Sequence, residues 1–343
     1  MAYSTINKSS LHFSPTLYVG NGGTLTVTGV PFEPDMTWLK NRAVAGDNEI
    51  YDKLRGATYR IYPNTNGSQD ALAQGLQAWT SDGFRVGNNN AINGNGNNHV
   101  SWNWKMNGTG ASNTEGSINT TATSANTTSG CSIITYTGTG ANATIGHGLG
   151  MVPTFIIFRR YAQAENWNVY HKSAGADKSL RLNEKGASAS DSTALNSTAP
   201  TSSLISLGSS VNTNANGNPM IAWCFSDVKG FSKAEKYRGN GNVDGSFQYL
   251  GFKASWIMIK KNSGSTDWMI FDNKRNGFNP DNNALNANLN DSEGATDYLD
   301  ILSNGFKIRT TDGLVNEVDS DYFYIAFAEA PFVGSNNIPA TAR

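Results

Sequence analysis

The stretch Tyr18-Val19-Gly20-Asn21-Gly22 gives the clearest indication of the fold, because similar stretches occur twice more in the chain. The other copies are Tyr136-Thr137-Gly138-Thr139-Gly140 and Tyr237-Arg238-Gly239-Asn240-Gly241. The copies are spaced by about 100 residues, which is the size of a complete small β-sandwich. Solenoids and propeller blades repeat at only about 20–50 residues. The repeat therefore predicts three autonomous domains on one chain rather than one closed repeat structure.

The segments that follow each opening stretch recur as well. An apolar run ends in basic residues at Met36-Thr37-Trp38-Leu39-Lys40, Phe155-Ile156-Ile157-Phe158-Arg159-Arg160 and Trp256-Ile257-Met258-Ile259-Lys260-Lys261. A β-branched, an aromatic and a polar residue follow at Ile50-Tyr51-Asp52, Val169-Tyr170-His171 and Ile270-Phe271-Asp272. Another apolar run closes each copy, at 100–104, 221–225 and 325–328. Short runs of this kind between clusters of Gly, Asn, Asp and Ser are typical of strands.

The sequence thus predicts an all-β fold of three tandem β-sandwich domains, of jelly-roll or lectin-like type, from an internal repeat of about 100 residues. We expect these domains at residues 1–106, 131–228 and 229–343. Residues 107–130 indicate a polar linker, because they contain one Ile and no aromatic residue. One short helix is predicted over 70–79, where Ala71, Leu72 and Leu76 stand at helical spacing.

The composition excludes several classes of protein. The 343 residues carry a formal net charge of −1 and only 15% charged residues, so they lack the basic surface of a nucleic-acid-binding protein. No stretch reaches the roughly 18 apolar residues that span a membrane, and the first ten residues lack the apolar run of a secretory signal. The 8 Trp, 13 Tyr and 15 Phe residues suffice to bury a core. We expect a soluble chain made in a cytoplasm, without nucleic-acid partners or membrane insertion.

The residues that carry chemistry form no catalytic or metal-binding pattern. The histidines lack the spacing of zinc ligands to one another or to the cysteines; they are His12, His99, His147 and His171. Among the acidic residues, only the position of Asp52 and Asp272 recurs between copies. Cys131 and Cys224 could pair if their strands were neighbours, but two buried thiols in a reducing compartment are the favoured interpretation. We expect no catalytic residue, no metal and no cofactor, and therefore no enzyme.

Two tryptophans are the candidate ligand-binding residues. Carbohydrate-binding surfaces stack sugar rings on exposed aromatic side chains. Six of the eight tryptophans lie in recurrent strands, where core packing is the default: Trp38, Trp102, Trp167, Trp223, Trp256 and Trp268. Trp79 and Trp104 are the two that we expect to reach a surface, where they are candidates for contact with a glycan.

Several recurring segments resemble virion proteins of marine tailed bacteriophages. They are Trp102-Asn103-Trp104-Lys105 with the segment from Ala111 to Ile118, the segment from Tyr136 to Gly150, Val169-Tyr170-His171-Lys172-Ser173, and the segment from Tyr324 to Phe332. The resemblance covers almost the whole chain, from Tyr18 to Phe332. Such proteins are usually described as tail fibres or as uncharacterised phage structural proteins with repeated β-domains. The family offers no catalytic motif to carry over to this sequence.

The resemblance implies a non-enzymatic virion component, located on the tail or capsid surface and assembled in the host cytoplasm. The first hypothesis is a tail fibre or receptor-binding protein for host attachment, which contacts a host surface glycan and other virion proteins. By analogy with phage fibres it would be a homotrimer. The alternative is a capsid decoration protein (a head fibre) or a tail adaptor with no receptor role. A depolymerase, which would need two carboxylates flanking a cleft, comes third.

Overall fold

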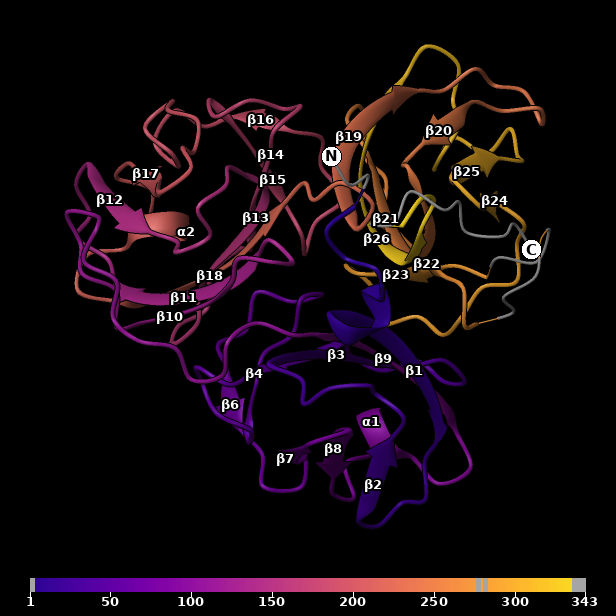
Figure 1. Ribbon diagram of the computed structural model, residues 1–343, viewed down its shortest axis with the longest axis horizontal. Helices are drawn as coiled ribbons and strands as arrows, with labels where there is room; N and C mark the ends of the chain where they lie inside the picture. Colours follow the sequence, from indigo (N-terminus) through magenta and orange to yellow (C-terminus); the bar gives the residue numbers. More distant parts are fainter. Residues whose placement is uncertain (1–3, 276–278, 280–282, 335–343) are drawn as a thin grey trace.

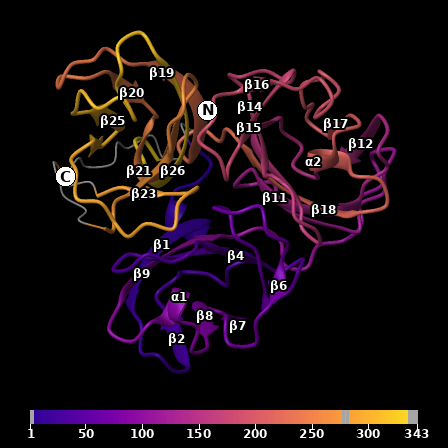
Figure 2. The ribbon, with the colours of Figure 1, turned by 180° about the vertical axis from the view of Figure 1, so that it is seen from behind.

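The computed structural model describes residues 4–275, 279 and 283–334 of the chain. The prediction of an all-β fold is confirmed. Helical structure in the described residues is limited to η1 (Ser9–Leu11), α1 (Asn90–Asn93) and α2 (Val211–Asn214). Figure 1 shows three lobes around a common centre, and Figure 2 shows the same three lobes from behind. We call them block 1 (residues 4–106), block 2 (107–228) and block 3 (229–334).

Block 1 contains a large antiparallel sheet and a small outer one. The order of the large sheet is β1 (Phe13–Val19), β9 (Asn98–Trp104), β3 (Met36–Asn41) and β4 (Glu49–Asp52). The outer sheet has the order β2 (Leu25–Thr28), β8 (Gly83–Val86) and β7 (Leu76–Thr80). A short pair, β5 (Tyr59–Arg60) and β6 (Asp70–Ala71), lies beside them. The helix predicted over 70–79 is therefore wrong, because the segment forms β6 and β7.

Block 2 repeats this order and extends it. Its large sheet runs β10 (Ala122–Asn126), β11 (Cys131–Thr137), β18 (Pro219–Ser226), β13 (Pro153–Arg160), β14 (Asn168–His171), β15 (Lys178–Arg181) and β16 (Ala189–Ser190). Its outer sheet pairs β12 (Ala143–Gly146) with β17 (Leu204–Leu207). Strands β11, β18, β13 and β14 correspond to β1, β9, β3 and β4 of block 1.

Block 3 has the same plan. Its large sheet runs β19 (Ser232–Arg238), β26 (Asp321–Pro331), β21 (Phe252–Lys261), β22 (Trp268–Asp272) and β23 (Leu285–Asn286). Its outer sheet runs β20 (Phe247–Tyr249), β25 (Gly305–Ile308) and β24 (Leu299–Leu302). The repeat seen in the sequence is thus a repeat of strand order.

A hydrogen-bonded lock explains the opening stretch of each copy. In block 1 the Tyr18 hydroxyl donates to the carbonyl of Ile92 (2.6 Å), and the buried Asn93 side chain donates to the carbonyls of Gly23 (2.6 Å) and Gly87 (2.7 Å). A Cβ on Gly20 would stand only 2.2 Å from the carbonyl oxygen of Gly94, so this position requires glycine. The equivalent asparagines, Asn214 and Asn316, make the same contacts in blocks 2 and 3. Sequence reasoning identified the tyrosine and the glycines but missed the asparagines.

The three blocks share one central core, which corrects the expectation of autonomous domains. Each large sheet packs one face against its own outer sheet and the other face against the other two blocks. At the centre three repeat-equivalent rings meet: Trp104 lies 6.1 Å from Phe225 and 5.8 Å from Phe327, and the two phenylalanine rings are 5.5 Å apart. An autonomous sandwich buries only the space between its own two sheets, whereas here the second face of each large sheet is buried too.

The expected polar linker is an ordered part of block 2. Strand β10 (Ala122–Asn126) pairs antiparallel with β11, with Ser124 opposite Ile133. Ala111 bridges back to Thr123, and Ile118 bridges to Ile145 of β12. A strand at a sheet edge is held through its backbone, so small polar side chains suffice there. The lack of apolar residues in 107–130 therefore misled the linker prediction.

Candidate binding groove between blocks 1 and 3

The structure separates the two tryptophans that the sequence singled out. Trp79 lies on β7 in the outer sheet of block 1, where it is half-buried and its indole N–H donates to the Thr37 hydroxyl (3.2 Å). Trp104 is buried at the centre of the molecule, with 2% of its surface exposed, so the expectation that it reaches a surface is wrong. The reason is that β9 is an inner strand of the large sheet and Trp104 points at the shared core. The other six tryptophans are buried, as expected.

Buried cations join the blocks at one end of the core. The Lys40 ammonium donates to the carbonyl of Gly46 (2.7 Å) and to that of Leu289 in block 3 (3.3 Å). The Lys260 ammonium of block 3 donates to the main-chain carbonyl of Thr266 (2.8 Å) and to the main-chain carbonyl of Lys185 in block 2 (2.7 Å). Burial lowers the pKa of Lys40 and the pKa of Lys260 to about 8.

The third cation completes a ring of contacts. Arg159 of block 2 donates to the carbonyls of Asn66 (2.8 Å) and Gly67 (2.5 Å) in block 1, and burial lowers its pKa to about 10. Each block therefore places one cation on the loop of the next, in the cyclic order 1 to 3, 3 to 2 and 2 to 1. The basic residues that end each apolar run in the sequence hold the blocks together.

The recurrent polar position also joins blocks at the end of β14 and at the end of β22. Asp272 pairs with Arg275 (2.7 Å) and accepts from the indole N–H of Trp102 in block 1 (2.9 Å). Burial opposes the charge of Asp272, but Arg275 and these hydrogen bonds outweigh it and lower the pKa of the carboxyl. In block 2 His171 takes this place and donates through Nε2 to the carbonyl of Tyr324 (3.1 Å), which leaves Nδ1 to accept from Ser173 (3.1 Å).

The two cysteines and two of the histidines, His99 and His171, are buried. Cys131 and Cys224 are free thiols on the neighbouring strands β11 and β18, and burial raises the pKa of both. Burial also lowers the pKa of His171 and of His99 to about 4. Within residues 4–275, 279 and 283–334, no three His, Cys, Asp or Glu side chains come together as a metal site would require. The buried polar groups described above, Lys40, Arg159, Lys260 and Asp272, bind each block to a neighbouring block.

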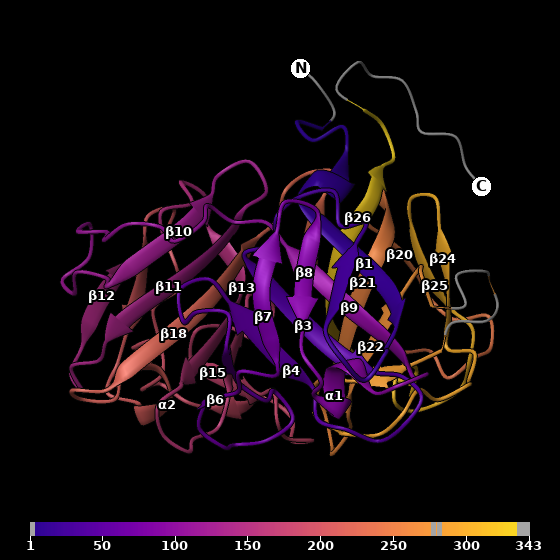
Figure 3. The ribbon, with the colours of Figure 1, turned by 90° about the horizontal axis from the view of Figure 1, so that it is seen from below.

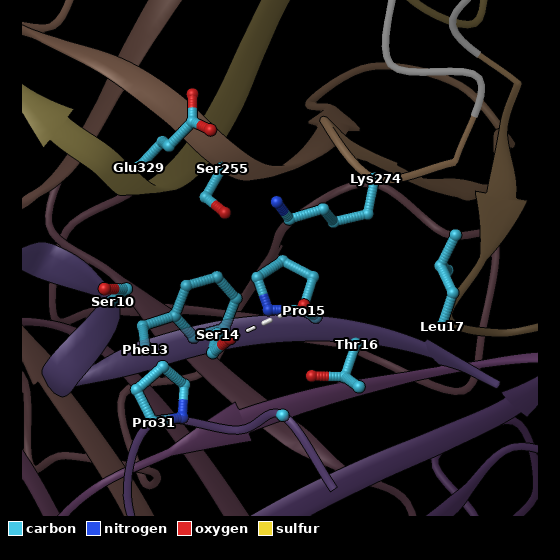
Figure 4. A pocket seen from close by; sticks show the side chains of 11 residues that line it. Ser10, Phe13, Ser14, Pro15, Thr16, Leu17, Pro31, Ser255, Lys274 and Glu329 are labelled. Atoms are coloured by element: carbon cyan, nitrogen blue, oxygen red, sulfur yellow. Dashed lines mark hydrogen bonds between the residues drawn. The ribbon is translucent and has the colours of Figure 1, made fainter.

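A groove of about 550 Å³ lies between blocks 1 and 3. One wall is η1 and the free edge of β1, with Ser10, Pro15 and Thr16. The other is formed by block 3, where Ser255 of β21, Glu329 of β26 and Lys274 after β22 face across the hollow (Figure 4). Pockets that hold small ligands measure about 300–1,000 Å³. This groove is therefore large enough for a ligand, and its lining combines polar side chains with apolar ones such as Phe13 and Pro31.

Several polar groups of the groove are available to a ligand. The Glu329 carboxylate pairs with Lys253 (2.7 Å), and the Ser255 hydroxyl donates to the Asn273 side chain (3.2 Å). The hydroxyls of Ser10 and Thr16 and the ammonium of Lys274 are engaged by no other described residue. The Lys274 side chain is exposed and points into the groove (Figure 4). No sequence motif marks this site, because its residues come from distant segments that the fold brings together.

Comparison with known proteins yields one match. A family model described as a domain of unknown function (DUF7483) matches residues 8–331. No curated protein and no solved structure matches the chain. Over the described residues, no helix has both the length and the apolar composition that crossing a membrane demands.

Proposed function

The chain belongs to the family described as a domain of unknown function (DUF7483), and we propose that it is a non-catalytic structural protein of a bacteriophage virion. Its role in this proposal is that of a tail fibre or receptor-binding protein that contacts the host surface. The observation that carries the proposal is the use of the buried polar groups. Lys40, Arg159, Lys260 and Asp272 bind the blocks to one another, and they are closed to a substrate.

A catalytic site needs a reactive group that a substrate can reach, with a partner that positions it. The open groove between blocks 1 and 3 instead presents hydroxyls, the ammonium of Lys274 and the carboxylate of Glu329, which is paired with Lys253. Such a surface suits binding without chemistry. The resemblance of the sequence to virion proteins of marine tailed phages supports a place on a virion, and the low content of charged residues, 15%, suits a part that is packed into an assembly.

Adsorption to host cells tests the proposal. Purified protein should bind susceptible cells in a saturable manner and should block infection when it is added before the phage. Gold-labelled antibody against the protein should mark the tail of the virion in electron micrographs. Label on the capsid together with failure to adsorb would favour the capsid decoration protein, and label at the neck or baseplate without adsorption would favour the tail adaptor.

The predicted homotrimer remains a prediction, and the structure gives it a specific test. The chain of 36.8 kDa already carries three equivalent blocks around one centre. Sedimentation equilibrium should give three times the chain mass if three copies associate, as a phage fibre would require. A mass equal to one chain at micromolar concentration would remove the trimer from the proposal.

A further inference from the structure

We propose that the groove between blocks 1 and 3 binds an oligosaccharide that carries a carboxylate group. This inference rests on the proposed function, which needs a host surface ligand, and it names the site and the chemistry of that ligand. It places recognition away from Trp79 and Trp104, the residues that the sequence favoured.

The first support is a comparison of three equivalent positions on the equivalent strands β1, β11 and β19, at the side of each strand that faces away from its β9, β18 or β26 neighbour. They stand three residues before the repeated tyrosine: Pro15 in block 1, Ile133 in block 2 and Ala234 in block 3. Ile133 is paired with Ser124 of β10, so an extended segment of the chain covers the edge of block 2. The N–H of Ala234 donates to the Asp227 carboxylate (2.7 Å), so a side chain covers the edge of block 3.

In block 1 the equivalent position is occupied by a proline, and the groove lies beside it. The hydrogen bonds of Gly20 and His12 to the continuation of β9 show that even-numbered residues of β1 face β9, so the nitrogen of Pro15 faces the groove. Proline has no N–H to donate to an added strand, and its ring stands where that strand would pair. The groove is therefore poorly suited to an extended peptide, although it is the counterpart of the place that β10 fills in block 2.

The second support is the chemistry of the lining. Sugars present hydroxyl groups at the ring edges and C–H groups at the ring faces. The hydroxyls of Ser10, Thr16 and Ser255 offer donors and acceptors for the former, and the ring of Pro15 offers an apolar surface for the latter. The hydroxyls come from both walls, so a ligand that spans the groove can bind to both blocks.

The third support is the charge. Glu329 is paired with Lys253, which leaves the exposed ammonium of Lys274 as the uncompensated charge of the block 3 wall within the described residues. An ammonium gains most from a carboxylate, because a charge-assisted hydrogen bond is about twice as strong as a neutral one. The ligand class that fits hydroxyls and one cation is an acidic oligosaccharide.

Titration of the full-length protein with defined oligosaccharides tests this inference. The acidic probes are trigalacturonate, a hyaluronan tetrasaccharide and 3′-sialyllactose; maltotriose is the neutral probe, and a peptide with the sequence of residues 120–128 is the strand probe. We expect calorimetry at low salt to show saturable binding of at least one acidic probe. Affinity should fall as salt rises, because the cation is exposed to solvent.

Three variants assign the binding to the groove. Lys274→Gln should lower the affinity for the acidic probe by about tenfold, because one charge-assisted hydrogen bond is lost. Thr16→Phe should abolish binding by filling the hollow, with thermal unfolding as the control for folding. Lys178→Gln removes a charge from β15 of block 2 and should leave affinity unchanged.

The outcomes separate this inference from the proposed function. It is overturned if none of the acidic probes binds, if Lys274→Gln and Lys178→Gln behave alike, or if the peptide binds more tightly than the sugars. If the wild-type protein still adsorbs to host cells in any of these cases, the proposed function stands and only the site is wrong. If adsorption fails while an acidic probe binds the groove, the binding site stands and the receptor role is wrong.

Discussion

The centre of the molecule is alike in the three blocks, whereas the outer sides of the equivalent strands β1, β11 and β19 differ from block to block. At the centre the blocks are equivalent: Trp104, Phe225 and Phe327 occupy one repeat position and pack on one another. At the edges the equivalent residues Pro15, Ile133 and Ala234 are protected by three unrelated devices. The repeat therefore preserves the residues that join the blocks. What each block presents outward has diverged, and the open groove lies in that divergent region.

The largest effect should come from the centre. Trp104→Ala should lower the free energy of unfolding by about 3–5 kcal/mol, because it leaves a cavity where three blocks meet. Trp79→Ala is the matched control: its side chain is half-buried in the outer sheet of one block, so it should cost less than half as much. Urea unfolding followed by circular dichroism measures both. Equal losses would mean that the centre has no special weight.

The buried ion pair of Asp272 and Arg275 in block 3, where Asp272 also accepts from Trp102 of block 1, comes next. Arg275→Leu should cost about 3 kcal/mol, because it leaves the Asp272 carboxylate buried without its counter-charge. Arg238→Leu breaks the pair of Arg238 with Asp319, whose side chains are 63% and 77% exposed, and should cost less than about 1 kcal/mol. Chemical denaturation of the two variants in parallel provides the measurement. A small effect of Arg275→Leu would show that this junction contributes little to stability.

His171 of block 2 should make the stability of the protein sensitive to acid between pH 6.5 and pH 4, a range in which the equivalent Asp272 of block 3 stays charged. Burial lowers the pKa of His171 to about 4, so the folded state resists a proton that the unfolded chain takes up near the ordinary histidine pKa of 6.5. Stability from this group is complete above pH 6.5 and is lost as the pH falls toward 4, by up to about 3 kcal/mol at 1.36 kcal/mol per unit. His99 behaves alike.

Comparison of His171→Gln with the wild type between pH 7 and pH 4 isolates this contribution. The variant keeps an N–H donor for the carbonyl of Tyr324, and its stability should fall less steeply with acid than that of the wild type. Parallel curves would contradict the assignment of the acid response to His171.

The smallest effect should come from the edge of block 1. Pro15→Ala restores an N–H on the free edge of β1, and an unprotected edge promotes pairing with another chain. We expect stability to change by less than about 1 kcal/mol, as for a surface substitution, while self-association rises several-fold in sedimentation velocity. Thr16→Ala is the control, because the backbone N–H of residue 16 faces β9 and is not changed by the substitution. This variant should not self-associate more than the wild type. Unchanged sedimentation of Pro15→Ala would show that Pro15 does not protect the edge.

The sequence predicted the strands better than it predicted how they pack. Runs such as Phe155–Arg160 and Trp256–Lys261 are rich in β-branched and aromatic residues, and they form β13 and β21 within the predicted all-β fold. The alternation of Ser101 and Asn103 with Trp102 and Trp104 indicates a half-exposed strand. In the structure all four are buried, because Ser101 and Asn103 donate to carbonyls of β1 and are covered by block 1 itself.

The shared core and the groove were beyond reach of the sequence for physical reasons. Hydrogen bonds from side chains to main-chain carbonyls, such as those of Lys40 and Lys260, depend on which loops meet, and any loop offers a carbonyl. Strand β10 has no signal in the sequence, because it is held by its backbone hydrogen bonds and consists of small residues such as Ser124. The repeated basic residue after each apolar run was visible, but its role as a link between blocks needed the three-dimensional arrangement.

The three blocks form one unit around a common core, with helices α1 and α2 at one end of the molecule (Figure 3). Differential scanning calorimetry shows whether the blocks unfold as one unit. One cooperative unit predicts a single transition in which the calorimetric and van't Hoff enthalpies agree. A calorimetric enthalpy about three times the van't Hoff enthalpy, or transitions that separate by block, would mean three independently unfolding domains. That result would contradict the account.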